Sequence, residues 1–306
     1  MTTQKLEPKP FKTFQEQLEI YKNRGLIVED DGYALRYLQT IGYYRLSGYA
    51  YPFRKMLADK TRADAFMPNT HFSDIKALYV FDRKLRQLAI DALERIEVAM
   101  RVQICYRLSR YGATAHLQSR AFNDGFNRNR WLSKYYQLIE REQKNSDFVK
   151  HHEEKYLEMP IWVHSELWDF GTMSMLYQGM RQADKDKIAR YFGLPTHKQL
   201  ETQLRALNII RNISAHYARL WNRHIGTPAS FKNMGQPWES FSENNVLVYF
   251  CLIQYLLKKI SPNSQWGKRF LALLDEFPKV ENNAIGLEQM GLNVSLDAFK
   301  RWELWG

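Results

Sequence analysis

The sequence is poor in cysteine, glycine and proline, and it lacks a long apolar run. Its 306 residues include two Cys, 15 Gly and 10 Pro. Cys105 and Cys251 lie in separate apolar stretches, which excludes a disulfide framework or a cysteine-based zinc site and indicates two buried, reduced thiols. So few glycines and prolines argue against an all-β chain with many tight turns. The longest apolar run, residues 246–257, is too short to span a bilayer and predicts a buried core helix.

Negative charge is also in short supply, because 33 Asp and Glu stand against 44 Lys and Arg, for a formal net charge of +11. Such a surplus points to a polyanionic partner, of which nucleic acid is the commonest, although a basic surface also suits an anionic membrane or simple solubility. The first ten residues are polar and lack the apolar segment of a signal peptide. We therefore expect a cytoplasmic protein.

Helical spacing of apolar residues predicts an all-α fold. The clearest run covers residues 73–110, which no Gly or Pro interrupts, and predicts a helix more than about 50 Å long. Thr13 and Glu16 form a capping box, whereas Gly42, Gly48 and Pro52 are expected to break any regular element in the tyrosine-rich segment near residue 43. Further helices are expected at about 32–40, 130–143, 161–180, 185–191, 196–223 and 246–260. We expect an N-terminal helical region packed on the core (1–70), a helical core (71–262) and a C-terminal helical tail (263–306).

The expected helix at residues 196–223 is strongly basic. No acidic residue occurs between Thr202 and Trp238. At about 100° per residue, one face of this helix would carry a polar stripe: Arg205, Asn212, His216, Arg219 and Arg223. The opposite face would be apolar and face the core: Leu207, Ile210, Ile213, Tyr217, Leu220 and Trp221. Asn212 and His216 form an i, i+4 pair, and Arg211 flanks it.

These residue types suit the cleavage of RNA without a metal ion. Histidine titrates near neutrality and can move a proton, whereas the planar donors of arginine can stabilise charge on a phosphate. Asparagine can orient the histidine or hold a phosphate oxygen. The catalytic candidates are Arg211, Asn212 and His216. The RNA-binding candidates on the same stripe are Arg205, Arg219 and Arg223. The alternative is a solvated basic face with an incidental histidine.

A second candidate RNA-binding patch lies at the start of the helix expected at residues 130–143. It interleaves charged and aromatic side chains, as single-stranded RNA would require: Arg128, Arg130, Trp131, Lys134, Tyr135 and Tyr136. Of these, Arg130 and Lys134 are the binding candidates, and the alternative is a solvated helix anchored by its tryptophan. His151, His152, Glu153 and Glu154 contain metal-ligand types, but adjacent helical residues point apart, so we expect no metal site.

Several stretches of the chain resemble a known family. Residues 211–216 match the Arg-x(4–6)-His signature of HEPN domains, and residues 212–223 resemble the Abi-like family of the AbiD and AbiF type. The same family pattern continues in residues 41–49, 78–86, 96–101 and 160–171. The resemblance covers about residues 11–260, and the tail after Pro262 lies outside it.

This resemblance implies a HEPN-type helical bundle with additional N-terminal helices, acting as a metal-independent endoribonuclease toxin in abortive infection. In such enzymes the 2′-OH of the RNA attacks the adjacent phosphate and leaves a 2′,3′-cyclic phosphate and a 5′-OH. HEPN sites take two motifs, and the single good copy here implies a homodimer that places two His216 side chains face to face. The family also implies a small non-coding RNA as a restraining partner, and a role for Glu97 and Arg101 in orienting Arg211 or His216. For Glu97 and Arg101 the alternative is a surface ion pair. No cofactor is implied.

Two other functions remain open on the sequence alone. A HEPN-like protein that holds RNA without cutting it would carry the same basic stripe, but only the enzyme needs Arg211 and His216 together near a dimer axis. A DNA-binding regulator needs a helix free to enter the major groove, and the apolar face of the basic helix argues against that. The motifs of serine and cysteine hydrolases are absent from the sequence.

Overall fold

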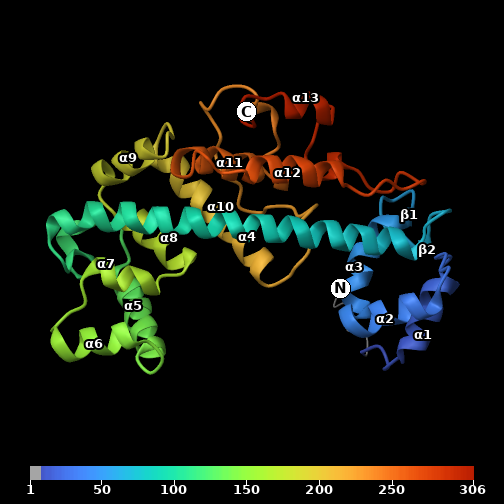
Figure 1. The fold of residues 1–306 in the computed structure, drawn as a ribbon, viewed down its shortest axis with the longest axis horizontal. Coiled ribbons are helices and arrows are strands. Elements are labelled where there is room, and N and C mark those ends of the chain that lie inside the picture. Colours follow the sequence, from blue (N-terminus) through green and yellow to red (C-terminus); the bar gives the residue numbers. More distant parts are fainter. Residues whose placement is uncertain (1–7) are drawn as a thin grey trace, which may run out of the picture. The chain divides into compact units, whose positions relative to one another are not determined.

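The computed structural model describes residues 8–306, and nearly all of their regular structure is helical (Figure 1). These residues form thirteen α-helices and one two-stranded antiparallel sheet, so the predicted all-α class is confirmed as a mostly helical fold with one small sheet. Within the described residues, none of the helices combines the length and apolarity needed to cross a membrane. The chain divides into two compact units, Met1–Lys84 with Leu273–Gln289, and Leu85–Ala272 with Met290–Gly306.

Unit 1 combines the N-terminal helices with a late segment of the chain. Its elements are α1 (Phe14–Asn23), α2 (Asp31–Ile41), α3 (Tyr43–Ala50), β1 (Arg54–Met56), β2 (Arg62–Phe66) and the first turns of α4 (Phe72–Leu108). The capping box of α1 is confirmed, because the Glu16 N–H donates to the Thr13 hydroxyl and the Thr13 N–H donates to the Glu16 carboxylate. The late segment completes the core, where Phe277 packs edge-on against Phe81 at 4.9 Å between ring centroids.

The prediction that Gly48 breaks the tyrosine-rich segment was wrong, whereas Gly42 and Pro52 do interrupt the helices there. Gly42, at φ 88°, separates α2 from α3, but α3 begins at the next residue and includes Gly48. A glycine inside a helix costs roughly 1 kcal/mol. The helix persists because it buries Leu46 and Tyr49 completely, and the Tyr49 hydroxyl donates to Asp82 at 2.6 Å. Packing therefore outweighs local propensity here.

Unit 2 contains the rest of α4 and most of the later helices. These are α5 (Arg128–Glu142), α6 (Asp147–Lys155), α7 (Ile161–His164), α8 (Phe170–Gly179), α9 (Gln182–Tyr191), α10 (His197–Ala215), α11 (Val246–Ile260), α12 (Trp266–Asp275) and α13 (Leu296–Lys300), with α12 ending in unit 1. The long helix and the buried helix predicted from the sequence are confirmed as α4 and α11. The Trp266 indole of α12 donates to the Leu88 carbonyl of α4 at 2.8 Å, and Phe250 stacks on Phe270.

The single helix predicted over residues 161–180 is in fact two helices, α7 and α8. Between them lie a 3₁₀ turn, Ser165–Leu167, and the extended residues Trp168 and Asp169. Asp169 is the N-cap of α8, and its carboxylate accepts the Thr172 N–H at 2.6 Å. This cap satisfies a free N–H of a new first turn, so the chain restarts a helix rather than continuing one. As a result, Asp169 lies at a helix N-terminus in unit 2.

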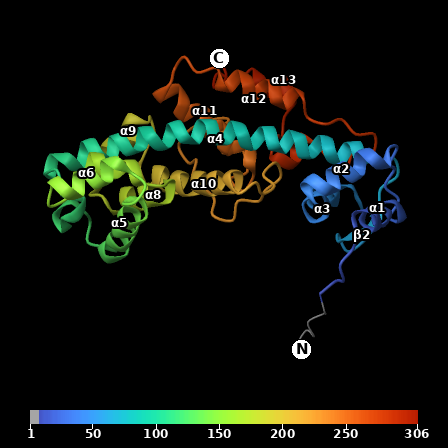
Figure 2. The same ribbon diagram turned by 60° about the horizontal axis from the view of Figure 1, so that its bottom comes forward.

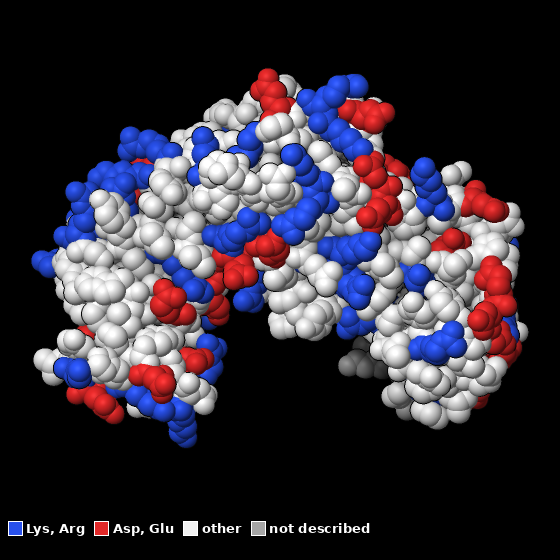
Figure 3. All heavy atoms as spheres, in the orientation of Figure 1, with Lys and Arg blue, Asp and Glu red and all other residues white. Residues whose placement is uncertain are grey.

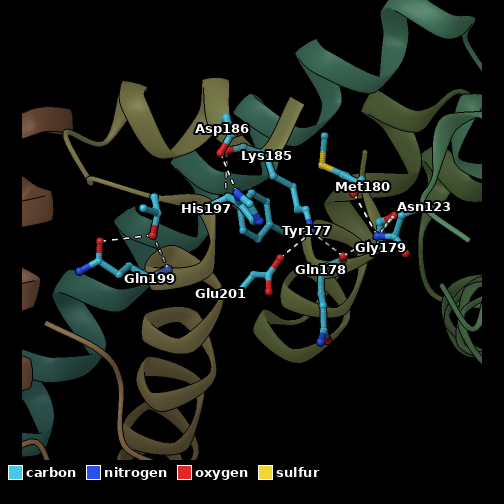
Figure 4. Close-up of polar contacts among 11 residues, drawn as sticks. Asn123, Tyr177, Gln178, Gly179, Met180, Lys185, Asp186, His197, Gln199 and Glu201 are labelled. Carbon is cyan, nitrogen blue, oxygen red and sulfur yellow. Dashed lines mark hydrogen bonds and ion pairs between the residues drawn. The ribbon is translucent and has the colours of Figure 1, made fainter. Parts of the chain in front are cut away.

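A polar network fixes α10 against α8 and α9 (Figure 4). The Lys185 ammonium pairs with the Glu201 carboxylate at 2.6 Å, and His197 pairs with Asp186 at 2.6 Å. The Tyr177 hydroxyl of α8 donates to the Lys185 carbonyl at 3.1 Å. Figures 1 and 2 show α8 and α10 side by side. These contacts hold the start of α10, and thereby set the direction in which its C-terminal end presents the candidate site.

Candidate functional site

Helix α10 ends at Ala215, eight residues before the predicted end. His216 is its C-cap, and Tyr217 adopts a left-handed conformation with φ 58°. The N–H of Tyr217 donates to Ser214, and that of Ala218 donates to Ile213 at 3.0 Å. This pair of bonds is a Schellman motif, which normally places glycine where Tyr217 stands. For a residue with a side chain this conformation costs roughly 1–2 kcal/mol.

The early end divides the predicted polar stripe. Arg205, Asn212 and His216 are exposed on α10 and at its cap, whereas Arg219 and Arg223 lie in the irregular segment that follows. Tyr217, predicted to face the core, is 67% exposed. Leu220 and Trp221 are buried as predicted, but they reach the core through a turn rather than along a helix. The continuous stripe was therefore wrong, although its first three members share one surface.

Glu97, which is buried, and Arg101, which is half-buried, form an ion pair on α4. The Arg101 guanidinium donates both to the Glu97 carboxylate and to the Trp168 carbonyl. Glu97 is buried, and burial raises its pKa above the ordinary value although the charges of Arg101 and Arg211 act in the opposite direction. The alternative of a surface ion pair is therefore wrong for these two residues.

Arg211 lies near two carboxylates. Its positive charge acts on both Glu97 and Asp169, which places it close to α4 and to the start of α8. Its Nη1 donates to the Asn212 side-chain oxygen at 3.3 Å. Burial acts to raise the pKa of Asp169, but hydrogen bonds from Thr172 and the charges of Lys134 and Arg211 outweigh it and lower that pKa.

Asp169 and Asn208 are the members of this cluster that the sequence reasoning missed. They converge on Gly171, where a Cβ would lie 3.4 Å from the Asp169 carboxylate and 3.5 Å from the Asn208 amide nitrogen. An Asp directly before an apolar run, which here begins at Phe170, is a helix-start pattern that could have identified Asp169. Asn208 lies three residues before Arg211 and so shares its side of α10.

The second candidate patch does not present its aromatic rings as a stacking surface. Trp131 and Tyr135 are fully buried, and they pack around His164. Only Arg130 and Tyr136 of the patch are exposed, whereas Lys134 is half-buried within range of Asp169. Arg130 lines a separate pocket of about 350 Å³ that also contains Lys185 and Glu201. The tryptophan anchors α5, as the alternative interpretation held.

Two histidines are buried next to these aromatic rings. His116 and His164 stack at 5.8 Å, and the Trp168 indole donates to His164 at 2.7 Å. Burial lowers the pKa of His116 to about 4 and that of His164 to about 3. Both rings are therefore neutral at pH 7. Trp168 connects His164 to Arg101, because its indole donates to His164 and its backbone carbonyl accepts from the Arg101 guanidinium.

Acidification should destabilise the protein through these rings. Each histidine takes up its proton in the unfolded chain near pH 6.5 but in the folded chain only near pH 3–4, so stability is full above pH 6.5 and is lost as the pH falls. For His116 alone the loss between pH 7 and pH 4.5 is about 2–3 kcal/mol. Urea unfolding at both pH values should show that His116→Phe reduces the drop by this amount. His151→Phe, at an exposed position, is the matched control, and an equal drop in wild type and His116→Phe would contradict the assignment.

The surface shows no segregation of charge on the face that can be seen in Figure 3, and the metal-ligand residue types are not clustered in the described residues. On the face drawn in Figure 3, Lys and Arg side chains are spread over the surface with Asp and Glu among them. In the described part of the chain, residues 8–306, no group of three or more His, Cys, Asp or Glu side chains is arranged to hold a metal ion.

Comparison with known proteins agrees with the motifs in the sequence. The family model described as Abi-like protein matches residues 36–222, which include the second half of α2, the helices α3 to α10, and Glu97, Arg211 and His216. The chain belongs to the Abi-like family. No curated protein and no solved structure matches it significantly. Membership of the Abi-like family indicates a role in abortive infection, a defence against phage.

Proposed function

We propose that this Abi-like protein is a cytoplasmic, metal-independent endoribonuclease of the HEPN type that acts as an abortive-infection toxin. The observation that carries the proposal is the position of Arg211. It lies within range of Glu97 and Asp169 and hydrogen-bonds Asn212, and His216 follows Asn212 by one helical turn. An arginine and an exposed histidine five residues apart at the end of one helix suit a phosphate whose charge increases during reaction.

The reaction follows from these roles. The 2′-OH of a ribose attacks the adjacent phosphorus, its proton moves to a histidine, and the bond to the 5′ oxygen breaks as that oxygen takes up a proton. The products are a 2′,3′-cyclic phosphate and a 5′-OH end. His216 moves the protons and Arg211 stabilises the phosphorane charge. A homodimer would supply two His216 side chains, one for each proton transfer.

Other charged residues are assigned to RNA binding or to positioning. In this proposal, the exposed side chains of Arg205, Arg223 and Arg130 contact phosphates, which would make binding salt-dependent. Arg219 and Lys134, both half-buried, contribute from the edge of the same region. Glu97 and Arg101 hold Arg211 in place without contacting RNA. A small non-coding RNA bound to the same surface would restrain the enzyme.

The test uses purified full-length protein, total cellular RNA and EDTA. New 5′-OH ends are labelled, cleavage sites are mapped, and the mapped sequence is resynthesised with a single 2′-deoxyribose at the scissile position. We expect cleavage in EDTA, cyclic phosphate ends, and complete loss of cleavage of the deoxy substrate, because the attacking hydroxyl is then missing. RNA that is bound but not cut would support the non-catalytic alternative. Cleavage that EDTA abolishes, or that persists on the deoxy substrate, would contradict the mechanism.

A further inference from the structure

Helix α4 presents an exposed apolar ridge within unit 2. Val98, Val102 and Tyr106 follow one another at intervals of four residues and are 51%, 57% and 63% exposed. Trp162 of α7, 51% exposed, lines the same pocket of about 290 Å³. Single exposed apolar side chains are ordinary, but a contiguous group with two large aromatic rings marks an interaction surface.

The ridge ends in opposite charges. Glu94 lies four residues before Val98, and Arg110 lies four residues after Tyr106, in the 3₁₀ turn that extends α4. Both are exposed. The order along the ridge is therefore acidic, apolar, apolar, aromatic and basic, at equal spacing and centred on Val102.

The order of residues from Glu94 to Arg110 is complementary to the same order read backwards, because the acidic end then meets the basic end. If two copies of α4 meet antiparallel about a two-fold axis at Val102, Val98 faces Tyr106 of the other copy and Glu94 faces Arg110 of the other copy. The interface then contains the Glu94–Arg110 pair twice, once on each side of the axis, as an isologous interface requires. A parallel arrangement would instead place Glu94 against Glu94.

We propose that this ridge binds a second copy of the chain through antiparallel packing of α4 on α4 about Val102. Arg101 lines the pocket beside the ridge and is bonded to Glu97. The two-fold axis therefore brings both Glu97–Arg101 pairs within about one helix diameter of it. The inference rests on the proposed function only where it links this interface to a catalytic site formed by two copies of His216. The exposure of the ridge and the charges at its ends do not depend on that function.

Sedimentation equilibrium of the full chain tests the charge pairing. Wild type should dimerise, and Val102→Glu should be monomeric, because it places two carboxylates at the axis. Glu94→Arg and Arg110→Glu should each weaken the dimer about 10-fold, since each creates two like-charge contacts. The double variant Glu94→Arg/Arg110→Glu should restore the wild-type dissociation constant within about 3-fold. Lys268→Glu, at an exposed position of α12, is the matched control.

The outcomes separate this inference from the nuclease proposal. A monomeric wild type, or a double variant no tighter than the single ones, would overturn the interface. If the double variant regains the wild-type dissociation constant but neither protein cleaves RNA, the interface is supported and the nuclease proposal is contradicted. Cleavage that persists in monomeric Val102→Glu would leave the enzyme in place and show that the site does not need this dimer. Circular dichroism checks that each variant is folded.

Discussion

Alanine at either His216 or Arg211 is expected to reduce the rate of RNA cleavage by a factor on the order of 10³. A general acid–base group contributes typically 10²–10⁴-fold, and a single charge-stabilising donor about 10²–10³-fold. Because the two side chains serve the same transition state, the double variant should cleave no more slowly than the slower single variant. Single-turnover cleavage of the mapped oligonucleotide measures all three rates.

Two further variants separate catalysis from binding and from charge. Arg205→Ala, on the exposed face of α10, should weaken RNA affinity and reduce the salt dependence of binding by about one ion, with the rate at saturating RNA unchanged. Arg211→Lys keeps the charge but loses the planar fork of donors, so its rate should lie between wild type and Arg211→Ala. If His216→Ala cleaves at the wild-type rate, the assignment of the site is wrong.

Arg101→Ala should cost about 3 kcal/mol of folding free energy at pH 7, the largest stability effect we expect from a single charged residue here. The change leaves the buried Glu97 carboxylate without its main partner and the Trp168 carbonyl without its donor. The pKa of Glu97 is already raised by burial, and it should rise further in the variant. Chemical denaturation of wild type and variant gives the difference directly.

The pH dependence of this difference identifies its cause. A carboxylate whose folded pKa lies above its unfolded pKa makes a contribution to stability that is fully present below the unfolded value and is lost as the pH rises through the folded value. The cost of Arg101→Ala should therefore be smaller at pH 5 than at pH 7. Glu97→Gln/Arg101→Met removes both charges and should recover much of the loss. A cost that is independent of pH and of Glu97 would show that only packing was lost.

The spacing of apolar residues correctly predicted the helices whose burial follows directly from their own sequence. The long apolar series of α4 and the apolar run of α11, which only Gln254 interrupts, fix these two helices closely, because burial along their length depends on little else. The same reasoning failed where tertiary contacts decide. It broke α3 at Gly48, joined α7 to α8, and extended α10 through Tyr217. In each case a cap or a buried side chain outweighed the local pattern.

For the candidate site, the sequence identified residue types better than their surroundings. Arg211, Asn212 and His216 follow from chemistry and spacing along one helix. Asp169 comes from a segment more than forty residues away along the chain, so only the fold reveals that it lies near Arg211. Similarly, nothing in the pattern of α5 distinguishes a ring that stacks on RNA from one buried against His164, as Tyr135 is.

Unit 1 is closed by residues that the ribosome makes late. Its core needs Phe277 against Phe81, and the segment Leu273–Gln289 belongs to it. At the usual speed of translation, the intervening Leu85–Ala272 takes roughly 10–40 s to synthesise. Throughout that time, the apolar surface of the N-terminal helices that Leu273–Gln289 covers remains exposed. A growing chain of this protein therefore cannot complete the core of unit 1 until residues 273–289 have emerged from the ribosome.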